Sequence, residues 1–395
     1  MSGTEQAFQF DKIINRREVP SLKVHPRVVG ATDKDLSAAG VADMDFIAPP
    51  AVLEALQQRL NHGVFGYEAV PDGLFPALVQ WLHHRHGWEV NPGSILRAPN
   101  VLNALAIATS LFTAQGDSII IQPPVFFDFF DIIRENNRAP VQHPLRFEDG
   151  KYHMDVDDLE YKAADPRVKM LYLCNPHNPV GRVWTREELL ALGDICNRYQ
   201  VLVVADEIHG DITYSNHRYI PYASLGSEYA NNSITCLSPA KSFNLASCCS
   251  AFTVIADADK RARFQAENSR LTVNKNNAFA NVAMEAAYQY GEPWLDQVLV
   301  YLEENLALVR ERLQSIPQVN LIEPEGTFLL WLDFRPLGLA PDELITFLRT
   351  QAKWVVSRGH AFGAQGAGFV RVNIGCTRAR LETALEQLLR ALSGL

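Results

Sequence analysis

The sequence has 395 residues, which exceeds the size at which one hydrophobic core usually stops growing (about 250–300 residues) and predicts a large domain with a smaller companion. Hydrophobic residues make up 47% and charged residues 21% of the chain, which excludes a largely disordered protein. The formal net charge is -9 and no long basic run interrupts it, which argues against a nucleic-acid partner.

The first twenty residues contain no apolar run of signal-peptide length, and no later segment has the uninterrupted apolar length needed to cross a bilayer. We therefore expect a cytoplasmic protein without a membrane partner. Four of the six cysteines are scattered, and Cys248 and Cys249 are adjacent, which fits neither a metal nor a redox spacing. The eleven histidines show no ligand spacing either, so we expect no metal site.

In the middle of the chain, short runs of Val, Ile and Leu alternate with segments of helical periodicity. The runs are SIIIQPP (118–124), KMLYLCNP (169–176), VLVVADE (201–207), SITCLSP (233–239) and AFTVIAD (251–257). This alternation predicts an α/β fold with a largely parallel, buried sheet. A helix is predicted over 185–200, where Thr185 and Glu188 fit a capping box.

A longer helix is predicted from Pro293 to about Ile316, because apolar residues recur there at steps of three and four. Strand-like and helical segments then alternate: TFLLWLDF (327–334), PDELITFLRTQ (341–351), KWVVSR (353–358), GFVRVNI (368–374) and RARLETALEQLLRAL (378–392). We predict an N-terminal arm that forms part of the small domain (1–48), a large domain (49–290) and a C-terminal small α/β domain (291–395) joined by the long helix.

Three polar side chains follow three of the predicted strands. Loops at the carboxyl ends of parallel strands converge on one crevice, so Asn178, Asp206 and Lys241 are expected to meet there. A carboxylate after the apolar run VLVVA needs a partner for its charge, such as a protonated ring nitrogen. A lysine amine in this position can form a Schiff base with a bound aldehyde. The alternatives are an exposed turn lysine, an aspartate that caps a helix and an asparagine that makes a turn.

Seven motifs occur in a recognisable order. They are ADMDF (42–46), HGVFGYE (62–68), NPHNPVGRVW (175–184), DEIHGDI (206–212), AKSFNLA (240–246), PWLD (293–296) and GFVRVNIGC (368–376). The ordered set resembles the pyridoxal-phosphate-dependent enzymes of the aminotransferase class I/II family, in particular the cystathionine β-lyase branch of MalY/PatB-type carbon-sulfur lyases. The likeness extends from about residue 10 to about residue 392. It implies a fold-type I PLP-dependent transferase-like fold, a pyridoxal 5'-phosphate cofactor, a small amino-acid substrate and a homodimer with shared active sites.

The resemblance also implies roles around the cofactor ring. Lys241 is expected to bind pyridoxal phosphate as a Schiff base and then to move the Cα proton of the substrate. Asp206 is expected to pair with the pyridinium nitrogen, and Phe126 to stack on the ring. Asn178 is expected to donate to the ring 3-oxygen and to help hold the substrate carboxylate. His209 stands where many relatives carry a tyrosine that donates to the cofactor; a packed imidazole is the alternative.

Further residues are implied around the cofactor phosphate and the substrate carboxylate. The amides of Val101 and Leu102 begin a helical segment and are expected to bind phosphate, together with the Ser238 hydroxyl. Tyr67 is expected to reach the phosphate from the neighbouring subunit. Arg371 is expected to clamp the substrate carboxylate with its planar guanidinium.

The implied activity is β-elimination on cystathionine or a related cysteine S-conjugate, which releases a thiol, pyruvate and ammonia. An aminotransferase is the alternative, because the same residues serve both reactions, and a regulatory or binding protein that retains the fold is a second one. Phe126, Phe328 and Val24 stand where the branch commonly has tyrosine, tyrosine and tryptophan. These differences predict a less polar cleft.

Overall fold

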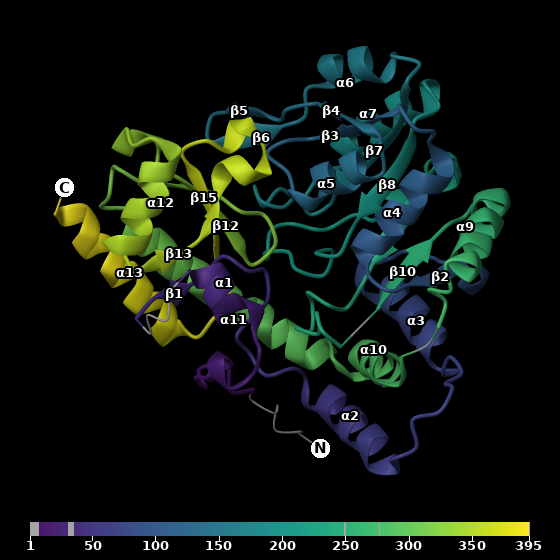
Figure 1. Cartoon of the computed structure of the whole chain (residues 1–395), viewed down its shortest axis with the longest axis horizontal. Coiled ribbons are helices and arrows are strands. Elements are labelled where there is room, and N and C mark those ends of the chain that lie inside the picture. Colours follow the sequence, from purple (N-terminus) through teal and green to yellow (C-terminus); the bar gives the residue numbers. More distant parts are fainter. Residues whose placement is uncertain (1–7, 31–34, 249, 276, 395) are drawn as a thin grey trace.

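The computed structural model describes residues 8–30, 35–248, 250–275 and 277–394. Parts of the predicted N-terminal arm (1–7 and 31–34) and Cys249 lie outside these residues. A smaller and a larger sheet lie side by side, and a long helix runs below them in the view of Figure 1. The α/β fold class predicted from the sequence is confirmed.

The larger sheet has seven strands within the described residues and contains all five apolar runs. In spatial order they are β2 (Ile95–Ala98), β10 (Ala251–Val254), β9 (Ser233–Leu237), β8 (Leu202–Asp206), β7 (Val168–Cys174), β3 (Ser118–Ile121) and β4 (Ala139–Gln142). The strands β9, β8, β7, β3 and β4 are mutually parallel, as predicted. Strand β10 runs antiparallel to both of its neighbours, because the connection from β9 contains no crossover helix.

Helices cover both faces of this sheet, which is why its central strands are apolar on both sides. One face packs against α4 (Val101–Phe112), α5 (Asp128–Glu135) and α9 (Ala258–Arg270). The other packs against α6 (Val156–Ala163), α7 (Arg186–Arg198) and the short α8 (Ser227–Asn231). At the β2 end, a third group consists of α2 (Pro50–His62), α3 (Leu74–His86) and α10 (Ala278–Tyr290). The helix predicted over 185–200 is α7, and its capping box is present.

The smaller sheet is antiparallel throughout, with α12 (Pro341–Thr350) and α13 (Arg378–Ser393) beside it. Its strands are, in order, β11 (Asn320–Ile322), β12 (Leu329–Asp333), β15 (Phe369–Asn373) and β14 (Ser357–Arg358). The run KWVVSR, predicted as one strand, is divided. Its first half is β13 (Trp354–Val355), which pairs with β1 (Ser37–Ala38), and its second half is β14, which pairs with β15. Side-chain periodicity does not specify a strand's partner, so the division was not visible in the sequence.

The long helix α11 (Glu292–Leu313) confirms the prediction over 293–316, although it ends three residues earlier. Its apolar stripe is buried, and it contacts α10 on one side and α13 and β11 on the other. The buried Asn305 donates from Nδ2 to the carbonyls of Ile374 (3.0 Å) and Cys376 (2.9 Å). These bonds fix α11 to the end of β15. The predicted domain boundaries at 48 and 290 stay a prediction.

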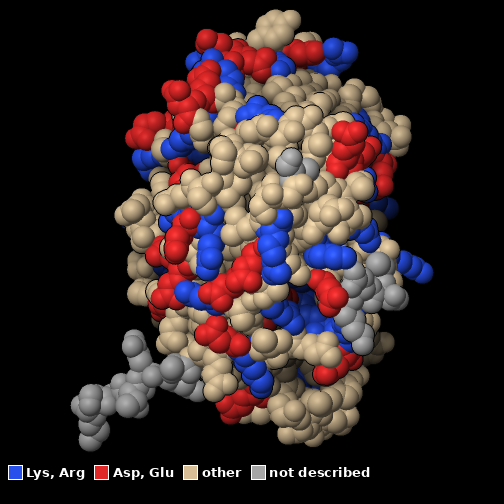
Figure 2. Space-filling model, turned by 90° about the vertical axis from the view of Figure 1, so that its left-hand side faces the viewer, with Lys and Arg blue, Asp and Glu red and all other residues tan. Residues whose placement is uncertain are grey.

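The N-terminal segment lies against the smaller sheet. It contains α1 (Pro26–Val29), two short 3-10 turns and β1, which hydrogen-bonds to residues 353 and 355. Figure 2 looks at this end of the molecule and shows acidic and basic side chains intermingled over it. Across the described residues, no helix combines the length and the apolar character needed to span a membrane. No group of three potential metal ligands was found in the same part of the chain.

Candidate active site

Three predicted site residues lie at or just beyond the carboxyl ends of three adjacent strands. Asn178 follows β7, Asp206 is the last residue of β8 and Lys241 follows β9. Since these strands are parallel neighbours, their carboxyl ends lie at one edge of the large sheet. The positive charge of Lys241 acts on Asp206. The three residues therefore face a common region, as the topology argument requires.

Arg371, which belongs to the small sheet, lies in the same region. It extends from β15, and its Nη1 donates to Asn178 Oδ1 at 3.0 Å. Its Nη2 donates to the Gly40 carbonyl at 2.7 Å and to Ser357 Oγ at 3.1 Å. Burial lowers the pKa of Arg371 to about 10, so the guanidinium is still charged at neutral pH. A buried cation held by neutral groups is suited to an anionic ligand.

The backbone of residues 40–42 connects this arginine to the lysine. Lys241 Nζ donates to the Ala42 carbonyl at 2.6 Å, two residues beyond the carbonyl that Arg371 contacts. Asn373 on β15 holds the loop from the other side by donating from Nδ2 to the carbonyls of Val41 and Asp43. The motif ADMDF thus forms one wall of the site. The motif was recognised in the sequence, but its position in the site was not predicted.

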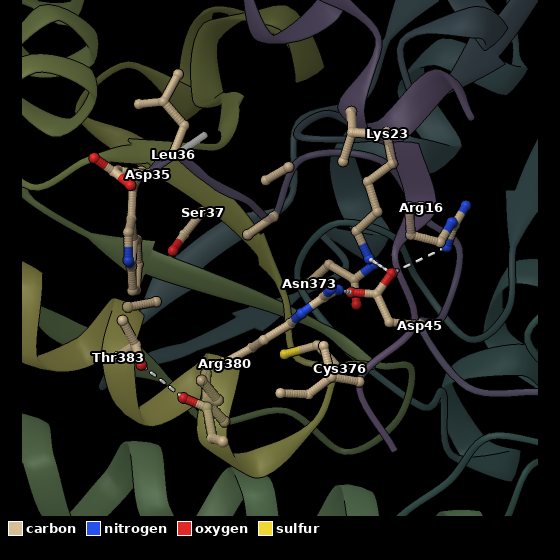
Figure 3. A pocket seen from close by; sticks show the side chains of 18 of the residues that line it. Arg16, Lys23, Asp35, Leu36, Ser37, Asp45, Asn373, Cys376, Arg380 and Thr383 are labelled. Carbon is tan, nitrogen blue, oxygen red and sulfur yellow. Dashed lines mark hydrogen bonds and ion pairs between the residues drawn. The ribbon is translucent and has the colours of Figure 1, made fainter. Parts of the chain in front are cut away.

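A cavity of about 480 Å³ lies behind this loop (Figure 3). Three cations converge on Asp45 at its edge: Lys23 at 3.0 Å, Arg16 at 3.0 Å and Arg380 at 3.2 Å. Asn373, Ala39 and Val24 also line this cavity, whereas Lys241, Asp206 and Arg371 do not. The ion cluster therefore holds the loop on the side of this cavity, and Lys241, Asp206 and Arg371 lie outside the cavity.

Asp206 and His209 are buried polar groups in the same region. Asp206 Oδ1 accepts a hydrogen bond from the Ile208 amide at 3.2 Å, and burial raises the pKa of this carboxyl group to about 6. It makes no ion pair with another described residue. His209 packs edge-on against Phe328, with 5.8 Å between ring centroids, and burial lowers its pKa so that the ring is neutral.

The unsatisfied polar atoms of Asp206 and His209 indicate whether a pyridoxal cofactor fits this region. Nδ1 of His209 has no hydrogen-bond partner among the described residues. Asp206 needs a cationic N–H group to compensate its buried charge. A heteroaromatic ring with a protonated nitrogen supplies such a group, so these residues fit pyridoxal phosphate.

The residues predicted near the phosphate are placed at three different locations. Val101 and Leu102 form the first turn of α4, where helix geometry leaves amide groups without an intrahelical partner. Ser238 follows β9, and its hydroxyl donates to the Ser250 carbonyl at 2.8 Å. Phe126 is half-buried and lies 4.9 Å from the Phe127 ring. Tyr67 does not reach the site within the subunit, because its relative exposure is 107%.

The turn that carries Lys241 is anchored to α3. Ser242 Oγ donates to Asp211 Oδ2 at 2.6 Å, while His86 Nε2 and Trp81 Nε1 contact Asp211 Oδ1 at 2.8 and 2.9 Å. Asp211 is only slightly exposed; desolvation raises its pKa, but these hydrogen bonds and the charge of His86 lower it further, so that the pKa lies below its ordinary value. The sequence analysis missed this anchor, although Asp211 belongs to the motif DEIHGDI.

Comparison with known proteins agrees with this geometry. A model of the aminotransferase class I and II family matches residues 37–388. The cystathionine beta-lyase PatB of Bacillus subtilis is 43% identical over 354 residues, which cover 89% of this chain and 92% of that protein. The resemblance stated from the motifs is confirmed.

Two solved structures have the same fold. Cystalysin from Treponema denticola, which contains a pyridoxal 5'-phosphate cofactor, has a TM-score of 0.95 at 29% identity and covers 98% of this chain and 100% of its own. The PLP-bound C-S lyase from Staphylococcus hominis has a TM-score of 0.89 at 28% identity, with 97% and 98% covered.

Proposed function

The chain belongs to the aminotransferase class I and II family, and from this premise we propose that it is a pyridoxal-phosphate-dependent carbon-sulfur β-lyase. Its substrate is L-cystathionine or a related cysteine S-conjugate, and its products are a thiol, pyruvate and ammonia. The observation that carries the proposal is the meeting of Lys241 and Arg371 on the 40–42 loop, beside the buried carboxylate of Asp206.

When bound, pyridoxal phosphate supplies an electron sink for the electron pair of the substrate Cα. We propose that Asp206 holds the ring nitrogen in its protonated form and that Asn178 and His209 contact other ring atoms. Phe126 covers one face of the ring. The first-turn amides of Val101 and Leu102 hold the phosphate group, which accords with the preference of helix N-termini for anions. The Ser238 hydroxyl joins them by turning its proton from the Ser250 carbonyl to the phosphate.

Lys241 moves the proton. Its neutral amine takes the proton from Cα, the Cα–Cβ double bond forms, and the Cβ–S bond breaks with its electron pair on sulfur. The departing thiolate needs a proton donor, and Phe126 and Phe127 have no hydroxyl group. The ammonium of Lys241 is therefore the donor that we assign. Water then converts the three-carbon fragment into pyruvate and ammonia.

Arg371 orients the substrate. Two parallel N–H bonds from its guanidinium to the α-carboxylate fix the rotation of the amino acid, and Asn178 supports one side of that pair. This orientation presents the Cα–H bond to Lys241. The buried cation also favours amino acids with a free carboxylate over amides and esters.

Transamination is the second candidate function, because the family is named for it and Lys241 would serve there as well. The two reactions differ in products. Elimination needs no second substrate and regenerates the enzyme in every turnover, whereas transamination stops after one equivalent unless an oxo acid is added. A regulatory protein that retains the fold would complete neither reaction.

The test is to incubate the holoenzyme with L-cystathionine without any oxo acid and to measure pyruvate, ammonia and thiol. We expect equal amounts of all three over many turnovers per subunit, and a loss of at least about 10³-fold in Lys241→Ala. One equivalent of oxo acid per subunit with the cofactor left as its amine form would favour the aminotransferase. No bound cofactor and no turnover with any amino acid would favour the regulatory protein.

We also propose that the enzyme is a cytoplasmic homodimer. An exposed apolar surface at the end of α2 and the following segment supports the dimer; it consists of Leu60, Val64, Phe65 and Tyr67. Tyr67 is then available to the phosphate site of a partner. The free, buried thiols of Cys174, Cys196 and Cys236 support a reducing compartment.

A further inference from the structure

The turn that carries Lys241 is closed by two hydrogen bonds of its own backbone. The Phe243 amide donates to the Pro239 carbonyl at 3.0 Å. The Leu245 amide donates to the Ala240 carbonyl at 2.9 Å. These bonds fix the shape of the turn, whereas its orientation depends on the side chains that extend from it to other parts of the molecule.

One anchor of the turn is the ADMDF loop (42–46), which borders the substrate site. Lys241 Nζ donates to the Ala42 carbonyl at 2.6 Å. Asn244, which has a positive φ of 57°, donates from Nδ2 to the carbonyls of Met44 at 2.9 Å and Phe46 at 2.8 Å. Its Oδ1 accepts the Met44 amide at 3.0 Å. Lys241 and Asn244 therefore extend from the turn to the same loop.

The other anchor is the hydrogen bond between Ser242 and Asp211. Ser242 is fully buried, and its hydroxyl donates to Asp211 Oδ2 at 2.6 Å. Trp81 and His86 of α3 contact the second oxygen of this carboxylate, Oδ1, at 2.9 and 2.8 Å. The pKa of Asp211 lies below its ordinary value, so the group is charged at neutral pH. A hydrogen bond to a charged acceptor is stronger than one between neutral groups, so it resists rotation of the turn.

Adjacent residues of the turn thus contact opposite anchors. Lys241 carries its amine on a flexible four-carbon stem, and this amine must reach the substrate Cα to take the proton. The bond of Ser242 restrains the backbone from which that stem extends. We propose that Ser242 and Asp211 are positioning residues that hold Lys241 in line for transfer of the Cα proton. This inference rests on the proposed function, in which Lys241 is the base.

The competing explanation is that the hydrogen bond between Ser242 and Asp211 only stabilises the fold. Ser233 provides a matched control, because it is buried at the start of β9, the strand that leads to the turn. Its hydroxyl donates to the Ala230 carbonyl at 3.2 Å. Ser233→Ala and Ser242→Ala therefore remove the same group from two buried sites. A purely structural role predicts that both variants lose thermal stability and that neither alters proton transfer.

The experiment measures, by NMR, how fast the holoenzyme replaces the deuterium of Cα-deuterated L-alanine with hydrogen from water. Lys241 takes the deuteron from Cα, exchanges it with water and returns a proton. We expect about tenfold slower exchange in Ser242→Ala, with the dissociation constant of L-alanine within about twofold of wild type. Ser242→Thr, which retains the hydroxyl, should stay within about threefold. Ser233→Ala should exchange at the wild-type rate.

Asp211→Asn provides a second variant, because it keeps the shape of the side chain and leaves one acceptor oxygen for donors on two sides. We expect slower exchange in this variant also, so it serves as the test if Ser242→Ala loses its fold. Thermal stability and the affinity of each apoprotein for pyridoxal phosphate are measured in parallel. Both should change by similar amounts in Ser242→Ala and Ser233→Ala, although only the first variant slows the exchange.

Alanine has no leaving group on Cβ, so the exchange is independent of carbon-sulfur cleavage. Exchange without elimination from L-cystathionine would contradict the lyase function and leave the positioning role in place. Equal exchange rates in Ser242→Ala, Asp211→Asn and wild type at matched cofactor content would overturn the positioning role, as would a loss of L-alanine binding that accounts for the slower rate. Absence of exchange in the wild type would overturn both.

Discussion

At the scale of single residues, the site is built from polar groups that are costly to bury. Glu207 illustrates how such groups are normally satisfied: it accepts hydrogen bonds from the Tyr219 hydroxyl and from the Tyr222 amide. Asp206, its neighbour in sequence, accepts only the Ile208 amide among the hydrogen bonds of the described chain. The contrast between the two adjacent carboxylates supports the proposal that Asp206 binds the ring nitrogen of the cofactor.

Asp206→Asn should change the pH dependence of stability in the apoprotein. The folded-state pKa of about 6 lies above the ordinary value of 3.8, so the carboxyl group favours folding at low pH and this contribution is lost as pH rises through about 6. The difference corresponds to roughly 3 kcal/mol as an upper limit. We therefore expect the variant to gain in unfolding free energy relative to wild type between pH 4 and pH 8.

Chemical denaturation at several pH values measures this gain, with the exposed Asp131→Asn as the control. The holoenzyme of Asp206→Asn should retain its fold and lose at least about 10²-fold in kcat. Near-normal turnover, or a difference in stability that does not vary with pH, would contradict the role assigned to Asp206.

At the scale of elements, caps and anchors position the loops that carry the site. The start of α7 is fixed by Thr185 and Glu188, and Glu188 also pairs with Arg182. Arg182 also forms an ion pair with Glu325, in the segment that leads into β12, with 2.8 Å between Nε and Oε2. This chain of contacts joins the loop after β7, which holds Asn178, to the small sheet.

Thr185→Ala removes the cap without touching the site. Thr185 is exposed, and its hydroxyl accepts the Glu188 amide at 3.2 Å. We expect a loss of about 1 kcal/mol in unfolding free energy, measured by chemical denaturation, and an unchanged kcat/KM. Thr185→Ser retains the hydroxyl and should lose little. A large loss of activity at full stability would show that α7 acts on the site in a way that its cap does not explain.

At the scale of the whole molecule, two sheets share one site. Lys241, Asp206 and Asn178 come from the large sheet and Arg371 comes from the small one, while the 40–42 loop lies between them. Helix α11 contacts both parts and is fixed to the end of β15 by Asn305. Tyr67 lies outside this arrangement, and a second copy of the chain is the partner that would use it.

Mixed dimers test the shared site. In a dimer of a Lys241→Ala subunit and a Tyr67→Phe subunit, one site combines Lys241 of one chain with Tyr67 of the other. If Tyr67 acts across the interface, this dimer should recover about half of the wild-type activity at limiting pyridoxal phosphate, where Tyr67→Phe alone is weakened. Absence of recovery in dimers confirmed by sedimentation would show that Tyr67 does not serve the partner.

The sequence by itself determined most of the elements and placed three polar residues at one edge of the large sheet. Apolar runs of limited length specify buried strands, Thr185 and Glu188 specify a helix start, and the position of Asn178, Asp206 and Lys241 after successive strands specifies one edge of the sheet. These features depend on local periodicity and on chain order, which a sequence states directly.

Only the tertiary structure decided which distant segments complete the site. The direction of β10, the division of KWVVSR between two sheets, and the contacts of Gly40 and Ala42 with Arg371 and Lys241 all depend on pairing across long separations. Such pairing depends on packing and hydrogen bonds between distant segments, and the local sequence of one segment does not reveal which other segment it will contact.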